Sequence, residues 1–254
     1  MNEKETNIII SRIEKWYNRL SEMFVEDRQS LAAEYCWSKE PISFAKKSEK
    51  KYKSITKGKS WGKEWDSAWF HLKGKIKKEW TNKIIVADLD FSGEGLVYDP
   101  KGNEIQGITN ASIWDPNFVR TRVILPKTCI NKNNVEIWVE TAANSLFGIY
   151  VDPDPEQDNP KRHGSFDAKV ETIDIGVFRK DIWDLYLDAR ILFGLIERLD
   201  KKSVRRARII NTMNNAIIAF KDDAKDAQSS RKILSQELNK RASSSSLKAA
   251  AVGH

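Results

Sequence analysis

The chain has 254 residues, of which 40% are hydrophobic and 10% aromatic, so it is long and apolar enough to bury a core and is not disordered. Its formal charge is +7, but acidic residues are almost as numerous as basic ones, which argues against nucleic acid as a partner. No apolar run approaches a membrane span and no secretory signal is evident, so no membrane association is expected.

The first predicted element is a helix over residues 1–38, because apolar side chains recur there every three or four positions. The residues that share this face are Ile9, Ile13, Trp16, Leu20 and Phe24. Pro41 interrupts the pattern, and the polar, basic stretch 42–60 is interpreted as a connection.

Beyond this connection the hydrophobic period becomes that of a strand. Val135, Ile137 and Val139 alternate with less apolar residues in NVEIWVETA, which predicts a strand with one buried face. Strand character also extends over 83–91, 117–126 and 165–175, and 95–108 is predicted to be two strands about a turn at 99–103. Several short strands separated by turns indicate an antiparallel sandwich.

Helical periodicity returns after Gly176. Apolar stripes predict one helix around 182–196 and a second around 210–220, followed by a polar break at 221–230 and a short helix to about 241. The loop 152–164 holds three prolines, 242–246 has linker composition, and 247–254 returns to strand character.

These elements predict a mainly β fold: an antiparallel β-sandwich of the jelly-roll, galactose-binding-like type, flanked by an N-terminal helix and C-terminal helices. The expected domains are a helical arm with its connection at 1–52, the sandwich at 53–176, a helical linker at 177–246 and a first strand of a further domain at 247–254.

Groups that carry chemistry are sparse. Cys36 and Cys129 form no disulfide framework and fit a reducing compartment, so a cytoplasmic location is predicted. His71 is expected to be a half-buried sheet histidine and His163 a solvated one, and neither has a second ligand at metal-binding spacing. We therefore predict no catalytic residue and no metal site in this chain.

Tryptophans offer a different kind of site. An aromatic face can stack on a pyranose, so the cluster Trp61, Trp65, Trp69 and Phe70 suggests sugar binding, although filling of the sandwich core is the favoured interpretation. If Trp65 and Trp69 lie in one strand, they share a face. Trp114 is the ring expected to be most exposed. The candidate carbohydrate contacts are Trp114, Trp61 and Trp65.

Asp184 and Asp188 are four residues apart on a predicted helix. Paired carboxylates can act as acid and base in glycoside hydrolysis. On a helix surface they more often pair with Arg or Lys, and that interpretation is preferred here.

Four stretches carry a resemblance to a known family. They are GKSWGKEWDSAWFHL (58–72), GEGLVYDPKGNEIQGI (93–108), VEIWVETAANSLFG (135–148) and DIWDLYLDARILFGL (181–195). In order and spacing they resemble the start of bacterial, fungal and vacuolar-type α-mannosidases of glycoside hydrolase family 38. AAAVGH (249–254) is similar to the strand and first two residues of the family's G-H-A-H-I-D segment, which opens its catalytic domain.

The resemblance implies that zinc ligands and nucleophile belong to a catalytic domain that follows His254, so no residue here matches them. We expect a non-catalytic N-terminal region of a zinc-dependent retaining α-mannosidase, whose partners are that catalytic domain and, in the parent, an α-mannoside. Self-association into a homo-oligomer stays open. The alternatives are a stand-alone carbohydrate-binding module and a protein-interaction module.

Overall fold

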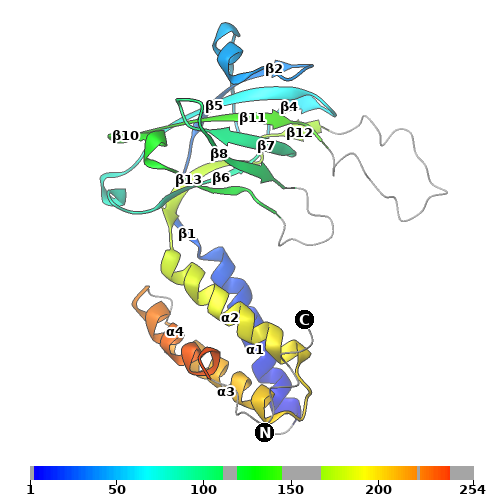
Figure 1. The fold of residues 1–254 in the computed structure, drawn as a ribbon, viewed down its shortest axis with the longest axis vertical. Helices are drawn as coiled ribbons and strands as arrows, with labels where there is room; N and C mark the ends of the chain where they lie inside the picture. Colours follow the sequence, from blue (N-terminus) through cyan, green and yellow to red (C-terminus); the bar gives the residue numbers. More distant parts are fainter. Residues whose placement is uncertain (1–2, 111–118, 145–166, 222–223, 241–254) are drawn as a thin grey trace, which may run out of the picture. The chain divides into compact units, whose positions relative to one another are not determined.

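The computed structural model describes residues 3–110, 119–144, 167–221 and 224–240, and the chain divides into two compact units (Figure 1). The sandwich unit comprises Val25–Phe178, and the helical unit comprises Met1–Phe24 with Arg179–His254. Within the described residues, no helix has both the length and the apolar character needed to cross a lipid bilayer.

The sandwich unit consists of antiparallel sheets (Figure 1). The four-stranded sheet runs, in spatial order, β1 (Val25–Ser30), β13 (Thr172–Phe178), β6 (Ile85–Asp90) and β9 (Arg122–Ile124). The larger sheet runs β3 (Lys53–Ile55), β2 (Ala32–Ser38), β5 (Ser67–Lys75), β11 (Asn134–Ala142), β7 (Glu94–Tyr98) and β8 (Glu104–Thr109), and β10 (Ile130–Asn131) pairs with β11. A third, two-stranded sheet pairs β4 (Ser60–Lys63) with β12 (Asp167–Lys169).

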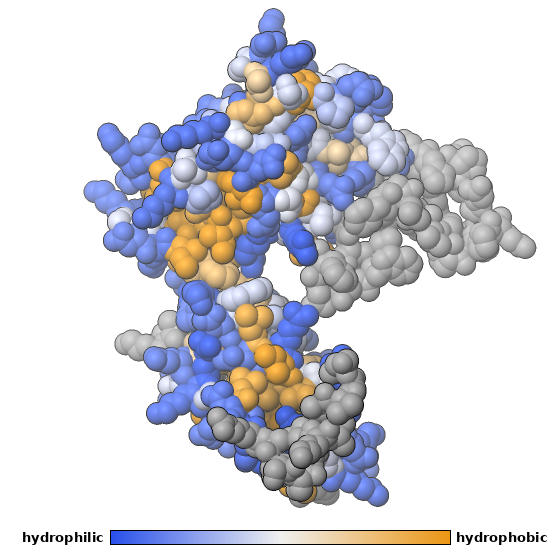
Figure 2. All heavy atoms as spheres, in the orientation of Figure 1, coloured by the Kyte–Doolittle hydropathy of each residue, from blue (hydrophilic) through white to orange (hydrophobic). Residues whose placement is uncertain are grey.

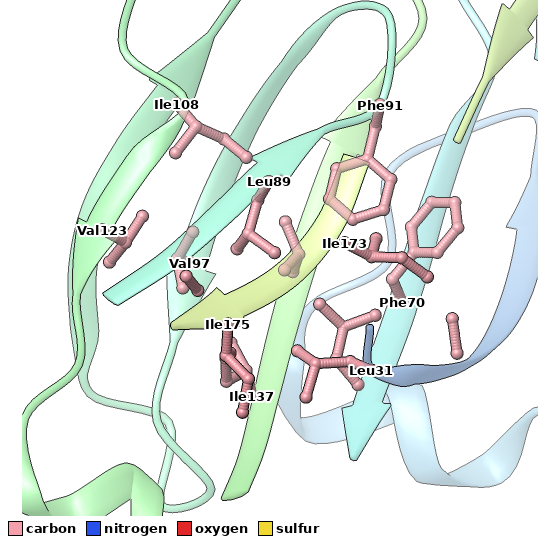
Figure 3. Close-up of a cluster of buried hydrophobic side chains, with 14 of the residues drawn as sticks. Leu31, Phe70, Leu89, Phe91, Val97, Ile108, Val123, Ile137, Ile173 and Ile175 are labelled. Atoms are coloured by element: carbon pink, nitrogen blue, oxygen red, sulfur yellow. The ribbon is translucent and has the colours of Figure 1, made fainter. Parts of the chain in front are cut away.

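The core lies between the four-stranded and the larger sheet. The predicted alternation in β11 is confirmed, because Val135, Ile137 and Val139 are all buried. Figure 3 shows Ile137 with Ile175 of β13, and the cluster as a whole draws apolar side chains from both sheets. Because side chains alternate across a strand, the neighbours of these residues point to the outer face of the larger sheet.

Part of that outer face is covered by the segment 41–52, which contains the short helix η1 (Phe44–Glu49). Phe44 packs edge-on against Trp69 of β5, with ring centroids 5.6 Å apart, and the Trp69 indole donates a hydrogen bond to the Ile42 carbonyl at 2.6 Å. The Lys47 ammonium lies 4.0 Å from the Trp138 ring centroid. Its burial lowers the pKa of Lys47. The rest of the outer face is left uncovered by η1.

The helical unit contains α1 (Glu3–Glu22), α2 (Lys180–Arg198), α3 (Val204–Ala219) and α4 (Ala224–Leu238). Helix α1 packs on α2, where the Tyr17 hydroxyl donates a 2.7 Å hydrogen bond to the Tyr186 hydroxyl and the two rings stack. In α4 the buried Ser230 hydroxyl donates to the Ala216 carbonyl of α3 at 2.8 Å. Two further short helices, η2 (Lys78–Trp80) and η4 (Lys127–Cys129), belong to the sandwich unit.

The structure confirms the fold class: an antiparallel sandwich flanked by helices. The N-terminal helix is confirmed, but its predicted extent over residues 1–38 is wrong, because α1 ends at Glu22 and two strands follow. Its heptad-like stripe stops at Phe24, and from Ala32 the chain pairs with β5.

Two expected boundaries also differ. The sandwich unit begins at Val25 instead of residue 53, because β1 and β2 belong to its sheets. Helix α4 begins at Ala224, inside the predicted polar break, and its Ala227 is fully buried. The segments predicted at 152–164, 242–246 and 247–254 lie outside the described residues.

Candidate functional site

A hollow of about 440 Å³ opens on the outer face of the larger sheet, next to Pro41, where the covering segment begins. We call it the sheet hollow. Its lining includes Ser67, Glu94, Leu96, Gly107, Glu140 and Ala142. These residues come from four adjacent strands: β5, β11, β7 and β8.

Strand register explains why these side chains meet. One row across the sheet pairs Ser67 with Ala142 and Ala142 with Glu94, and the next row pairs Glu140 with Leu96 and Leu96 with Gly107. Ser67, Ala142 and Gly107 have a small side chain or none. The sheet surface is therefore hollow at these positions, and the larger residues between them form its walls.

The two carboxylates of the sheet hollow have different surroundings. Burial raises the pKa of Glu140, and the Tyr98 hydroxyl contacts its Oε2 at 3.4 Å. Glu94 accepts a 2.7 Å hydrogen bond from the Asn144 side-chain amide, whose oxygen in turn accepts from the Glu94 backbone N–H at 3.0 Å. Glu94 is thus held in position at the start of β7.

A cation completes the polar lining. Arg120 lines the sheet hollow, and its backbone is fixed to Thr109 at the end of β8 by hydrogen bonds of 2.8 and 3.0 Å in both directions. The hollow therefore combines two carboxylates, one guanidinium and the apolar side chain of Leu96. In such a lining the carboxylates can accept hydrogen bonds from a ligand while the guanidinium donates hydrogen bonds to the same ligand.

The turn that carries Trp65 is bonded to the same edge of the sheet. The Trp65 N–H donates to the Ala143 carbonyl at 2.6 Å, and the Ala143 N–H donates to the Asp66 carbonyl at 2.8 Å. Trp65 has φ of +68°, which is rare for a bulky side chain, and is 59% exposed. The buried Asp66 carboxylate accepts from the Lys63 N–H at 2.7 Å and from Lys39 at 3.1 Å. These bonds fix the turn.

The three tryptophans predicted as sugar contacts differ in where they lie. Trp61 fills the core, which is the interpretation favoured for this cluster: it is 3% exposed, its indole donates to the Phe91 carbonyl at 2.9 Å, and its ring packs edge-on against Phe70. A ring enclosed in the core has no free face for a sugar. Trp65 and Trp69 do not share a strand face, because Trp65 lies in the turn before β5. Trp114 lies outside the described residues.

His71 is a half-buried sheet histidine, as predicted. Its ring stacks on Trp138 with centroids 3.7 Å apart, and Nε2 lies 2.8 Å from Glu136 Oε1. Burial lowers the pKa of His71, although the Glu136 carboxylate opposes this. His163 and His254 lie outside the described residues. Among the residues that the structure describes, no group of three His, Cys, Asp or Glu side chains could hold a metal, so these residues do not fit a zinc site.

The carboxylates on α2 are paired with basic side chains, which confirms the surface interpretation. Arg231 of α4 contacts Asp188 at 2.7 Å and Asp184 at 3.2 Å, and Lys180 contacts Asp184 at 2.7 Å. Neither aspartate is therefore left as an unpaired acid.

Sequence reasoning missed the sheet hollow. The period-two pattern of β11 was enough to place Glu140 on the face opposite the core. Nothing local in the sequence indicates that Glu94 and Gly107 lie on adjoining strands at the same height. That information is in the register of β7 with β11 and β8.

Comparisons with known proteins identify relatives of this chain. The family model described as "Alpha-mannosidase, jelly roll domain" matches residues 28–167. Alpha-mannosidase G of Dictyostelium discoideum is 24% identical over 225 residues, which cover 84% of this chain and 20% of that protein. Human alpha-mannosidase 2C1 is 23% identical over 183 residues, which cover 70% of this chain and 16% of that protein.

Among solved structures, a β-glucuronidase of Bacteroides uniformis matches with a TM-score of 0.40 and 12% sequence identity, over 59% of this chain and 17% of that chain. The chain thus spans about a fifth or less of the length of the curated relatives named above.

Proposed function

The chain belongs to the family of α-mannosidase jelly roll domains, and we propose that it is the N-terminal, non-catalytic region of a zinc-dependent retaining α-mannosidase. The observation that carries this proposal is the family match across the sandwich unit, joined to relatives that are much longer α-mannosidases. In that setting the partner of this chain is a catalytic domain of the same polypeptide, and the α-mannoside is the substrate of the whole enzyme.

The chemistry of the described residues supports a non-catalytic role. A zinc-dependent glycosidase needs three or four protein ligands around its metal. The described residues hold no such group, and the two acids on α2 are neutralised by Arg231 and Lys180. Zinc would be bound by the proposed catalytic domain, where it would grip sugar hydroxyls while carboxylates act as nucleophile and acid.

The role left to this chain is architectural. Its helical unit exposes large apolar side chains, among them Ile8, Ile191, Val204 and Ile218, which are between 57% and 79% exposed. Apolar surface on this unit is visible in Figure 2. Such surface is costly in water and favours cover by another protein surface. We propose that the catalytic domain provides this cover, with a subunit interface as a further use, in the cytoplasm.

The test compares this chain with the longer polypeptide. The coding sequence after the His254 codon should continue with Ala-His-Ile-Asp. The longer product should hydrolyse an aryl α-mannoside and lose that activity when a chelator removes zinc, whereas residues 1–254 alone should show neither turnover nor tight zinc binding by calorimetry. Turnover by the chain alone, with stoichiometric zinc, would refute the non-catalytic role.

A further inference from the structure

We propose that the sheet hollow is a binding site for a neutral glycan, which holds a pyranose ring over Leu96 and hydrogen-bonds its hydroxyls to Glu94, Glu140 and Arg120. The proposal goes beyond the architectural role, because it gives the sandwich unit a ligand of its own. The glycan-site proposal is also independent of the architectural role, since a domain that supports a catalytic domain can either bind sugar or not.

The space fits a ligand of this size. At about 440 Å³ the sheet hollow lies within the range of roughly 300–1,000 Å³ in which small-molecule sites fall. Its floor is the sheet itself, because Gly107 has no side chain and Ala142 has only a methyl group. The site is therefore part of regular strands and is held by their ladder hydrogen bonds.

The charges favour an uncharged polyol over an anion. Glu94 and Glu140 would repel a phosphate or other anion, and Arg120 offsets part of their attraction for a metal cation or a basic peptide. Sugar hydroxyls can both donate to carboxylates and accept from a guanidinium, so a glycan can use all three groups. Glu94 is already oriented by Asn144, which lowers the entropy lost when it binds a ligand.

Trp65 provides an aromatic surface beside this edge. It is exposed, although its turn is fixed by hydrogen bonds to Ala143 and by the buried Asp66 carboxylate. A bulky residue in the left-handed region costs conformational energy, and such strain is retained where the surrounding structure requires the residue. Stacking of the indole on the C–H face of a sugar would explain why a tryptophan is retained at this strained position.

The test is a titration of the whole chain with α-linked mannobiose, followed by calorimetry and by tryptophan fluorescence. We expect saturable binding in the millimolar to micromolar range. Gly107→Leu should abolish it, because the new side chain fills the hollow; the nearest atom to a Cβ there is the Gly95 carbonyl oxygen at 4.0 Å, so the fold has room for a side chain at this position. Glu140→Gln and Trp65→Ala should each weaken binding about tenfold.

Two controls separate the site from general damage. Glu104→Gln changes an exposed carboxylate on β8 outside the hollow and should leave binding unchanged. Circular dichroism should show that each variant is folded, and Glu140→Gln, which keeps the side-chain shape, serves as the readout if Gly107→Leu fails to fold. A flat titration, binding that survives Gly107→Leu in a folded protein, or saturation by Ca²⁺ in place of sugar would each overturn the proposal.

Discussion

The sandwich unit and the helical unit differ in the interactions that stabilise each of them internally. The sandwich unit has one continuous core of residues drawn from both of its main sheets, and β1 at its start pairs with β13 at its end. The helical unit instead combines narrow apolar stripes with discrete contacts at its helix surfaces, such as Tyr17–Tyr186 and Arg231–Asp188. We therefore expect the loss of a single side chain to lower the free energy of unfolding most in the core of the sandwich unit and least among the ion pairs on the helix surfaces.

The largest effect is expected for Phe70→Ala in the sandwich core. Phe70 is fully buried, and its ring lies 4.3 Å from Phe91 and 5.6 Å from Trp61 between centroids. Loss of the ring should lower the free energy of unfolding by about 3–5 kcal/mol. Urea unfolding followed by circular dichroism measures this. The matched control Ile124→Ala removes a side chain that is 57% exposed and should change stability by less than about 0.5 kcal/mol.

The next effect concerns a buried acid in the turn between β7 and β8. Asp99 is 1% exposed, and its carboxylate accepts hydrogen bonds from the N–H groups of Lys101 and Asn103 and from the Asn103 side chain at 2.8–2.9 Å. Asp99→Ala leaves these donors without their acceptor. We expect a loss of about 2–4 kcal/mol in the free energy of unfolding.

The same carboxylate makes the sandwich unit sensitive to acid. Burial alone would raise the pKa of Asp99, but the hydrogen bonds outweigh it and lower the pKa from 3.8 to about 2. Because the folded-state pKa is the lower one, the stabilisation is complete above the unfolded-state value and is lost as the pH falls from about 4 to 2. Asp99→Asn should lose that part of the pH dependence. An unchanged acid unfolding profile in this variant would contradict the assignment.

Local patterns predicted the regular parts of this structure. Alternation predicted β11, and the Asp99–Asn103 turn predicted the hairpin of β7 and β8, where Gly102 has φ of +91°. These features depend on residues close together in the chain. The strands β1 and β2 escaped prediction because their burial depends on pairing with β13 and β5, which no local period records.

The tryptophans near the candidate site also show that local sequence patterns do not determine which side chains are buried. Trp61 and Trp65 are four residues apart, yet one lies in the core and the other is exposed on a turn. The difference comes from Asp66, whose buried carboxylate accepts a hydrogen bond from the Lys63 N–H and so fixes the turn. Residues 63–66 contain no proline or glycine that would have predicted this turn. A sequence identifies such aromatic side chains as candidates, and the tertiary structure decides which of them reach the solvent.

A smaller effect tests the contact between α1 and α2. Tyr17→Phe removes the hydroxyl that donates to Tyr186 but keeps the ring, which also stacks on Phe193. Since the bond is only partly buried, the loss should be about 1 kcal/mol. The measurement is thermal unfolding of the chain with Tyr186→Phe and the double variant alongside. A double-mutant coupling near zero would show that the hydroxyls do not depend on each other.

The smallest effect is expected for the ion pairs between α2 and α4. Arg231→Met removes the cation that Asp188 and Asp184 share, while Lys180 still pairs with Asp184. The Arg231 side chain is 41% exposed, so solvent screens the pairs and the loss should be below about 1 kcal/mol. It should shrink further in 1 M salt, where screening is strong. Urea unfolding at low and high salt measures both quantities, with Lys180→Met as the matched control. A salt-sensitive loss above about 2 kcal/mol would reverse the comparison, because charges instead of apolar stripes would then hold α4 on α2.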